Sequence, residues 1–341
     1  MPNPLLDFYC IDPGNRTVQA MGAKSRLVES MPSLIHRSGR KAEHRVLEQT
    51  AFIDYLDGVH GTQYSRETVV LGRGAGRYGK SSKAVYKAES TPGSGKLQYL
   101  PFFVLGMLPL GSQTAADIGT IYTCHPEPTA EVIAQFREKL VGTHRYTKNG
   151  KLAERTILNV EVYPEGEPAY HWLVSSGTLN QELSNVIIDI GGLTAIASVY
   201  DDQGMMQRYV MRRGGTIDLA TRIGNSIQAD MPGEVADLSM IMDGMLNGSF
   251  QYGTRFSFES AYRFHAYQWT QDLVGEYMAQ FDNLIDSVSR VAFVGGGARY
   301  LDAGVILPLE NVGWFIPDSP ENANTMGLLT LGLNARQLKV A

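Results

Sequence analysis

The 341-residue chain has only two cysteines and no long apolar run, and these absences exclude several classes of protein. Cys10 and Cys124 are too few for a disulfide framework, and they lack the spacing of metal ligands. Because Cys10 lies in an apolar stretch, we expect it to be a buried core residue. The longest apolar run, residues 100–110, is about half as long as a bilayer span, and the first residues lack the basic stretch of a signal peptide. The sequence therefore predicts a cytoplasmic protein without membrane contacts.

The chain also lacks a strong excess of one charge and any metal-binding pattern. It has 30 Lys and Arg residues against 35 Asp and Glu residues, and its net charge of -5 argues against broad binding to nucleic acid or anionic lipid. Direct sequence-specific binding to nucleic acid is not expected either. Its seven histidines show neither HExxH nor paired spacing, so a metal site built from protein ligands alone is not expected. What the sequence does have is an ordinary globular composition, 43% hydrophobic, and enough length for two domains.

Strand-like and helix-like segments alternate along the chain, which predicts the α/β class. Residues 5–21 and 186–200 each have the pattern of a buried strand, a glycine turn and a second strand, which indicates a weak internal duplication. A hairpin is expected around Asn149-Gly150, because this dipeptide favours a tight two-residue turn. Its strands are expected at residues 144–147 and 152–162, further strands at 206–211 and 290–294, and helices at 41–57, 128–140, 259–285 and 328–338.

Three glycine turns directly follow buried strands and have the composition of phosphate-binding loops. The turns that begin at Asp12 and at Asp189 combine a carboxylate with glycine, which lets backbone N–H groups approach phosphate oxygens. A carboxylate at such a strand end can hold magnesium through its water shell. The third turn, residues 295–297, is a triple glycine, typical of close backbone approach to a ligand. Each turn alone is also common in proteins without a ligand, and it is their order that favours a nucleotide site.

The Gly- and Ser-rich segment 72–96 contains a competing pattern. From Gly74 to Ser81 it fits G-x-x-x-x-G-K-S, the Walker loop, which needs a buried strand before it and a helix after it. Residues 69–71 are a strand candidate, but no clear helix follows Ser81. We therefore interpret the segment as part of a mobile outer subdomain around residues 37–98 rather than as a Walker loop.

Four motifs in a fixed order carry a resemblance to a known family. They are IDPGNRT at residues 11–17, VYPEG at 162–166, IDIGGLT at 188–194 and FVGGGA at 293–298. In this order they resemble the actin-like ATPases, and most closely the bacterial and archaeal plasmid-segregation actins of the ParM type. The resemblance implies an actin-like ATPase fold, with two ribonuclease-H-like domains flanking a nucleotide cleft. Domain I would comprise residues 1–182 and 320–341, and domain II residues 183–319.

The resemblance also implies a role for each matching residue. Asp12 and Asp189 would face the magnesium ion of the nucleotide through water, and Glu165 would orient the attacking water. The implied nucleotide contacts are Gly14, Asn15, Arg16, Thr17 and Gln19 in the first loop, Gly191, Gly192, Leu193 and Thr194 in the second, Gly214, Gly215 and Thr216 near the ribose, and Gly295, Gly296, Gly297 and Ala298 under the adenosine. The segment NANTMG, residues 322–327, resembles the start of the last helix, which returns to domain I.

Two positions depart from the family pattern. Gln19 stands where relatives often carry a lysine, so the β-phosphate would meet an amide dipole in place of a charge, with Arg16 as a compensating cation nearby. Leu193 stands where many relatives have a third glycine, which ParM-type proteins also lack. Both departures bear on nucleotide affinity more than on the fold.

The resemblance implies a magnesium-dependent ATPase, with GTP as an alternative substrate, that forms dynamic filaments by self-association. Such filaments would serve plasmid or other DNA segregation through a DNA-binding adaptor protein. A small-molecule kinase of the same superfamily and a nucleotide-binding scaffold with little turnover are the alternatives.

Overall fold

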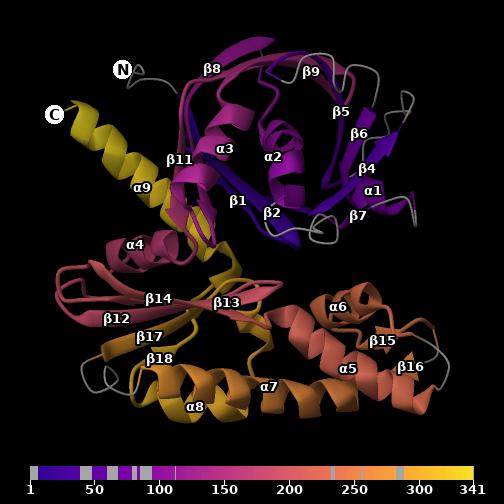
Figure 1. Ribbon diagram of the computed structural model, residues 1–341, viewed down its shortest axis with the longest axis vertical. Coiled ribbons are helices and arrows are strands. Elements are labelled where there is room, and N and C mark those ends of the chain that lie inside the picture. Colours follow the sequence, from indigo (N-terminus) through magenta and orange to yellow (C-terminus); the bar gives the residue numbers. More distant parts are fainter. Residues whose placement is uncertain are drawn as a thin grey trace. The chain divides into compact units, whose positions relative to one another are not determined.

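The computed structural model describes residues 7–38, 48–59, 68–78, 83–84, 94–111, 113–231, 235–254, 256–281 and 288–340. The chain divides into two compact units, which Figure 1 colours by sequence. Unit 1 comprises Met1–Ser175 and Asn324–Ala341, and unit 2 comprises Ser176–Ala323. Unit 2 is therefore inserted in the sequence between the two segments that form unit 1.

Unit 1 is built on a mixed sheet whose central part has the strand order β3-β2-β1-β8-β11. The first two pairings are antiparallel, whereas β8 is parallel to both β1 and β11. The strands are β1 (Asp7–Pro13), β2 (Thr17–Gly22), β3 (Glu29–Pro32), β8 (Ala115–His125) and β11 (Val160–Pro164). The sheet continues from β8 in the order β10-β9-β5-β6-β4-β7, through β4 (Leu34–Ser38), β5 (Thr50–Gly58), β6 (Thr68–Gly72), β7 (Lys83–Ala84), β9 (Gly142–Lys148) and β10 (Lys151–Ile157).

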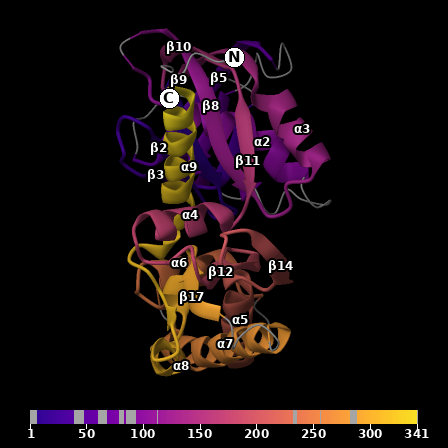
Figure 2. The same cartoon turned by 90° about the vertical axis from the view of Figure 1, so that its left-hand side faces the viewer.

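Helices cover both faces of the central strands of unit 1. Successive residues of β1 and β8 point to opposite faces of the sheet, and both faces carry buried apolar side chains that a layer of helices must cover. On one face, α2 (Ser94–Met107) and α3 (Ala130–Leu140) share a core with Ile11 and Val18. On the other, α9 (Ala323–Val340) packs Leu328 against Phe8 and Cys10. Figure 2 shows α9 on one side of β8 and β11 and the pair α2 and α3 on the other. The remaining helices of this unit are α1 (Arg73–Gly76) and α4 (Glu167–Ser175).

Unit 2 repeats the central topology of unit 1. Its sheet has the order β14-β13-β12-β17-β18, again with two antiparallel pairings followed by two parallel ones. The strands are β12 (Ser184–Ile190), β13 (Thr194–Tyr200), β14 (Met206–Arg213), β17 (Val288–Val294) and β18 (Trp314–Phe315). The motif-level duplication expected from the sequence thus corresponds to a repeated strand order.

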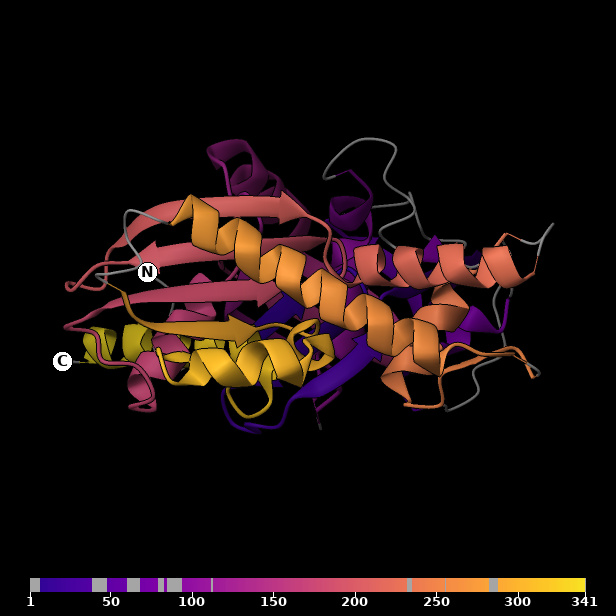
Figure 3. The ribbon, with the colours of Figure 1, turned by 90° about the horizontal axis from the view of Figure 1, so that it is seen from below.

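Helices also supply the core of unit 2. The long helix α7 (Glu259–Gln280) buries Trp269, Leu273 and Tyr277, and Figure 3 shows it as the orange helix that crosses the strands obliquely. The other helices are α5 (Thr216–Asp230), α6 (Leu238–Leu246) and α8 (Ala303–Glu310), and a small hairpin joins β15 (Gln251–Tyr252) to β16 (Phe256–Ser257).

Most of the predicted elements are confirmed. One predicted helix is a strand where it is described, and one predicted strand is divided into two. The helix predicted at residues 41–57 is wrong in its described part: residues 50–58 form β5, because pairing with β6 and β9 buries this segment in the sheet. The hairpin at Asn149-Gly150 is confirmed, with both residues at positive φ. Its second strand breaks at Leu158 and Asn159, so that β10 and β11 pair with different parts of β8. Residues 41–47, and Gly79, Lys80 and Ser81 of the Walker-like pattern, lie outside the described residues.

Candidate functional site

In unit 1, the predicted catalytic carboxylates lie at one edge of the sheet. The parallel register pairs Ile11 with Thr123, and Tyr163 with Cys124, so β1, β8 and β11 end side by side. Asp12 is half-buried at this edge, and the Cys124 thiol donates to its Oδ1 at 3.6 Å. Ligands of α/β proteins bind at the carboxyl ends of parallel strands. The topology therefore places Asp12 and the turn that carries Glu165 where a ligand of unit 1 is expected.

The turn between β1 and β2 requires its glycine and is held from outside. A Cβ on Gly14 would lie 2.5 Å from the Thr17 carbonyl oxygen, which is closer than real contacts allow. Ser33, only 2% exposed, donates its hydroxyl to the Gly14 carbonyl at 2.6 Å and its N–H to the Arg16 carbonyl at 2.8 Å. Asn15 and Arg16 are half-buried beside it. The loop is thus a tight, pre-formed turn, and Ser33 is a supporting residue that no motif indicated.

Glu165 follows β11 in a turn that is fixed on both sides. Its backbone N–H donates to the His125 carbonyl at 3.0 Å, at the end of β8. The next residue, Gly166, has a φ of 89° and donates its N–H to Asn324 Oδ1 at 3.2 Å. Gly166 is buried, and α4 begins at Glu167. The backbone around Glu165 is therefore anchored to a strand end and to the start of α9.

Gln19 lies directly opposite Asp12 in the hairpin and is 8% exposed. Its Oε1 accepts a hydrogen bond of 2.8 Å from the Thr325 hydroxyl, which is completely buried. The residue at the position where relatives carry a lysine is therefore tied to the last helix. This contact joins residues 306 positions apart, so no local pattern could have predicted it.

In unit 2, Asp189 and the triple-glycine turn meet at the carboxyl ends of β12 and β17. The register pairs Asp189 with Val294, the last residue of β17. Asp189 is 5% exposed, and a Cβ on Gly295 would lie 2.2 Å from its Oδ1. A Cβ on Gly297 would lie 2.3 Å from Ile190 Cγ2, and the Gly297 N–H donates to the Ile190 carbonyl at 2.8 Å. Side chains at these two glycines would therefore push the turn off the strand that carries Asp189, whereas a Cβ on Gly296 would meet open space.

The second loop, residues 191–194, is held by hydrogen bonds from the turn that precedes α5 and from the start of that helix. The loop carbonyls of Gly191, Gly192 and Leu193 accept from the N–H groups of Thr216, Ile217 and Gly214 at 3.1, 2.9 and 3.0 Å. A Cβ on Gly215 would lie 2.4 Å from the Gly191 carbonyl oxygen, so this turn needs glycine for the close approach. The structure thus brings the predicted ribose turn and the predicted second phosphate loop into one assembly.

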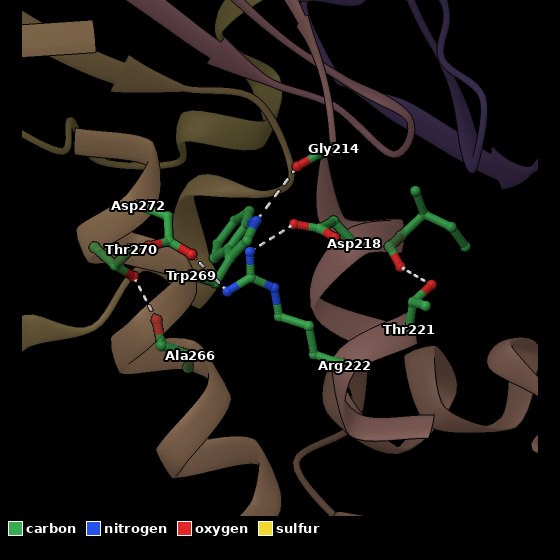
Figure 4. A network of polar contacts seen from close by, with 9 residues as sticks. Gly214, Asp218, Thr221, Arg222, Ala266, Trp269, Thr270 and Asp272 are labelled. Carbon is green, nitrogen blue, oxygen red and sulfur yellow. Dashed lines mark hydrogen bonds and ion pairs between the residues drawn. The ribbon is translucent and has the colours of Figure 1, made fainter. Parts of the chain in front are cut away.

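This assembly is supported from behind by a polar link between α5 and α7, drawn in Figure 4. The buried indole of Trp269 donates to the Gly214 carbonyl at 3.3 Å. Arg222 on α5 pairs with Asp218 at 3.2 Å on its own helix and with Asp272 on α7 at 2.8 Å. The long helix therefore positions the Gly214 turn directly, and the turn in turn holds the second loop.

We call Asp12 with its loop and the Glu165 turn the unit 1 half-site, and Asp189 with the second loop and the triple-glycine turn the unit 2 half-site. Burial raises the pKa of several groups on the strands that lead to the unit 1 half-site. Burial raises the pKa of the Cys10 thiol and of the Tyr122 phenol, and it raises the pKa of Tyr163 to about 12. These groups therefore stay neutral at ordinary pH. Cys10 is completely buried, as its apolar context predicted.

Several solved structures have a fold similar to that of this chain. The chain is similar to an apo ParM protein from pSK41, with a TM-score of 0.69 and 16% identity over 98% of this chain and 99% of that one. It is similar to ParM in a 15-stranded filament from Clostridium botulinum, with a TM-score of 0.75 and 15% identity over 96% and 99%. An archaeal actin homologue in complex with ADP gives a TM-score of 0.71 and 14% identity over 97% and 99%.

The chain therefore has the actin-like fold, and the resemblance to ParM-type proteins drawn from the four motifs is confirmed at the level of the fold. No family model matches the sequence, and no curated protein does. Within the described residues, no group of three or more His, Cys, Asp or Glu side chains could hold a metal ion. In the same part of the chain, no helix has both the length and the apolar character to cross a membrane.

Proposed function

We propose that this chain is an actin-like ATPase that binds ATP with magnesium and assembles into filaments by self-association. The observation that carries the proposal is the repeated construction of the half-sites. In each unit, the strand that carries an aspartate runs into a glycine turn, at the carboxyl edge of the same strand order. The fold is shared with a ParM that forms filaments and with an actin homologue that binds ADP. DNA segregation through an adaptor protein is the cellular role that we propose on the same ground.

The residues fit this ligand in their chemistry. Glycine at positions 14, 191 and 192 keeps side chains away from the loop backbones, as a phosphate requires. The Gly191 N–H already donates to Thr194 within the loop, so we assign the phosphate contacts of the second loop to Gly192 and Leu193. Asp12 and Asp189 supply carboxylates for magnesium-bound water. When bound, magnesium neutralises the charge that develops on the phosphates.

The proposed role of Glu165 is to orient the attacking water and to accept its proton. The hydrogen bonds at Glu165 and Gly166 hold the backbone of this turn, so the carboxylate is carried by a rigid support. Positioning supplies most of the catalysis in phosphoryl transfer, since the protein forms no covalent bond to the phosphate.

Glu165→Gln tests this assignment, because it removes the base and keeps the shape. We expect phosphate release to fall about 100-fold or more, the contribution typical of a positioned base. ATP binding and ATP-dependent light scattering should persist. Glu167→Gln is the matched control: it removes a carboxylate two residues away whose partner is His171 at 3.8 Å on the surface of α4. Unchanged phosphate release in Glu165→Gln would contradict the role of Glu165.

Light scattering of the wild-type protein, with phosphate release followed in the same sample, tests the function as a whole. Scattering should rise on addition of ATP and magnesium and decay as phosphate accumulates. Phosphate release without scattering at any protein concentration would exclude the filament. Transfer of phosphate to a small molecule would instead identify a kinase, and ATP binding without release a scaffold.

A further inference from the structure

The first turn of α9 carries two adjacent buried polar side chains that reach two different parts of the unit 1 half-site. Asn324 is 6% exposed and its Oδ1 accepts from the Gly166 N–H at 3.2 Å, next to Glu165. Thr325 is completely buried and donates to Gln19 Oε1 at 2.8 Å, across the hairpin from Asp12. Burying a polar side chain costs free energy unless the side chain forms a hydrogen bond. Each of these two hydrogen bonds therefore offsets the cost of burying its side chain.

A close backbone contact fixes the position of this helix turn. A Cβ on Gly327 would lie 1.7 Å from the Pro168 carbonyl oxygen, so α9 approaches the start of α4 as closely as glycine permits. The next two residues, Leu328 and Leu329, are buried against the face of the sheet that carries Cys10 and Cys124. The helix start therefore cannot shift relative to the Glu165 turn without losing both the packing and the hydrogen bonds.

The hydrogen bond from Thr325 fixes which end of the Gln19 amide points to α9. An amide has an acceptor oxygen at one end and a donor NH2 group at the other. Because Thr325 donates to the oxygen, the acceptor is directed to α9 and the donor away from it. Only the donor end suits an anionic phosphate. A lysine needs no such partner, since its ammonium group has donors alone.

We propose that Asn324 and Thr325 are positioning residues of the ATPase, and this inference rests on the proposed function. Thr325 orients Gln19 as a hydrogen-bond donor to phosphate and so acts on nucleotide affinity. Asn324 holds the turn of Glu165 and so acts on turnover. The last helix thereby couples phosphate binding to water positioning within unit 1.

The test uses the full chain, with nucleotide affinity measured by titration of a fluorescent ATP analogue and turnover by phosphate release. Thr325→Val removes the hydroxyl and keeps the shape, and should weaken nucleotide binding about 10-fold, the value of one hydrogen bond to a charged group. Thr325→Ser keeps the hydroxyl and should restore wild-type affinity. Asn324→Ala should lower kcat about 10- to 100-fold while affinity stays within about 2-fold, because a displaced Glu165 misaligns the water.

Thr330→Val is the matched control, since the Thr330 hydroxyl donates only within α9, to the Met326 carbonyl at 3.1 Å. Gln19→Met provides an independent variant should Thr325→Val fail to fold. It should lose the same affinity, and the double variant no more than either alone, because both changes remove one contact.

The outcomes separate this inference from the function on which it rests. If wild-type protein hydrolyses ATP but Thr325→Val and Asn324→Ala behave like Thr330→Val, the pair is structural and the inference is overturned while the function stands. If both variants lose affinity and turnover in equal proportion, the division of roles is wrong. If the wild-type protein neither binds nor hydrolyses nucleotide, the proposed function and this inference fail together.

Discussion

At the scale of the single residue, Lys148 has an unusual environment. It ends β9, and its ammonium group donates to the Leu108 carbonyl at 2.8 Å, just beyond the end of α2. Burial lowers the pKa of Lys148 to about 8. In the unfolded chain a lysine titrates near pH 10.4, so between about pH 8 and 10.4 the unfolded state binds more protons than the folded state. The contribution of Lys148 to stability therefore rises with pH in this window and is constant below it.

Lys148→Met should remove this pH dependence. From pH 8 to 9.5, the free energy of unfolding of wild-type protein should rise by about 1.5 kcal/mol relative to that of the variant. The comparison isolates Lys148, because the Cys10 thiol, whose pKa burial raises, gives both proteins the same opposite slope. Urea unfolding at four pH values measures it. Lys151→Met is the control, since Lys151 is exposed directly opposite in the hairpin. Parallel curves for wild type and Lys148→Met would contradict the assignment.

Some residues of the candidate site could be identified from the sequence, and others could not. The candidate carboxylates Asp12, Glu165 and Asp189 were identifiable because each lies at or just beyond the carboxyl end of a strand, in a recognisable order of motifs. Ser33, Asn324 and Thr325 were not, because their partners lie far away along the chain. The hydrogen-bond partner of such a hydroxyl or amide cannot be predicted from the residues that surround it in the sequence.

At the scale of elements, the pairing of α5 with α7 is the link that supports the second loop. Arg222 of α5 joins the two helices through Asp272 on α7 and also pairs with Asp218 on its own helix, with 25% of its side chain exposed. Arg222→Met should lower the free energy of unfolding by about 1 kcal/mol, and less at high salt, since partly exposed ion pairs are screened. Arg263→Met is the control: its ion pair with Glu259 lies within α7 and is 75% exposed on the arginine side. Thermal melts of both variants in low and high salt measure the difference, and equal losses would contradict a role in joining the helices.

Element prediction succeeded where local signals were strong. The predicted helix at 128–140 appears as α3, capped by Thr129, whose side chain accepts from the Val132 N–H at 3.3 Å. It failed at β5, where pairing on both edges overrides a helical pattern. α9 begins at Ala323, five residues before the start expected from the helical pattern at 328–338, and within the NANTMG segment that the resemblance gave as the start of the last helix.

At the scale of the whole molecule, the two units differ in how the chain completes them. Unit 2 is continuous, Ser176–Ala323, with a core of its own around Trp269 and Phe293. Unit 1 needs Asn324–Ala341, because α9 covers Phe8 and Tyr122. We therefore expect unit 2 to fold as an isolated fragment.

The measurement is calorimetry of the two fragments. Ser176–Ala323 should unfold cooperatively, whereas Met1–Ser175 alone should bind hydrophobic dye and aggregate through the face that α9 leaves open. A fragment of unit 2 without a cooperative transition would show that its core depends on unit 1. A well-folded Met1–Ser175 would show that α9 is dispensable for the core.

The sequence by itself determined the local features of this protein: the hairpin turn at Asn149-Gly150, the capped helix α3, the glycines that follow β1, β12 and β17, and the order of motifs that indicates the actin-like fold. The turn, the helix and the positions of the glycines follow from backbone sterics and from short-range periodicity, whereas the actin-like fold was implied by resemblance to a known family. The tertiary structure alone decided that β5 is a strand, that Trp269 and Arg222 support the second loop, and that Asn324 and Thr325 of α9 hold the Glu165 turn and Gln19. Those outcomes depend on contacts between distant segments, whose energies no local pattern records.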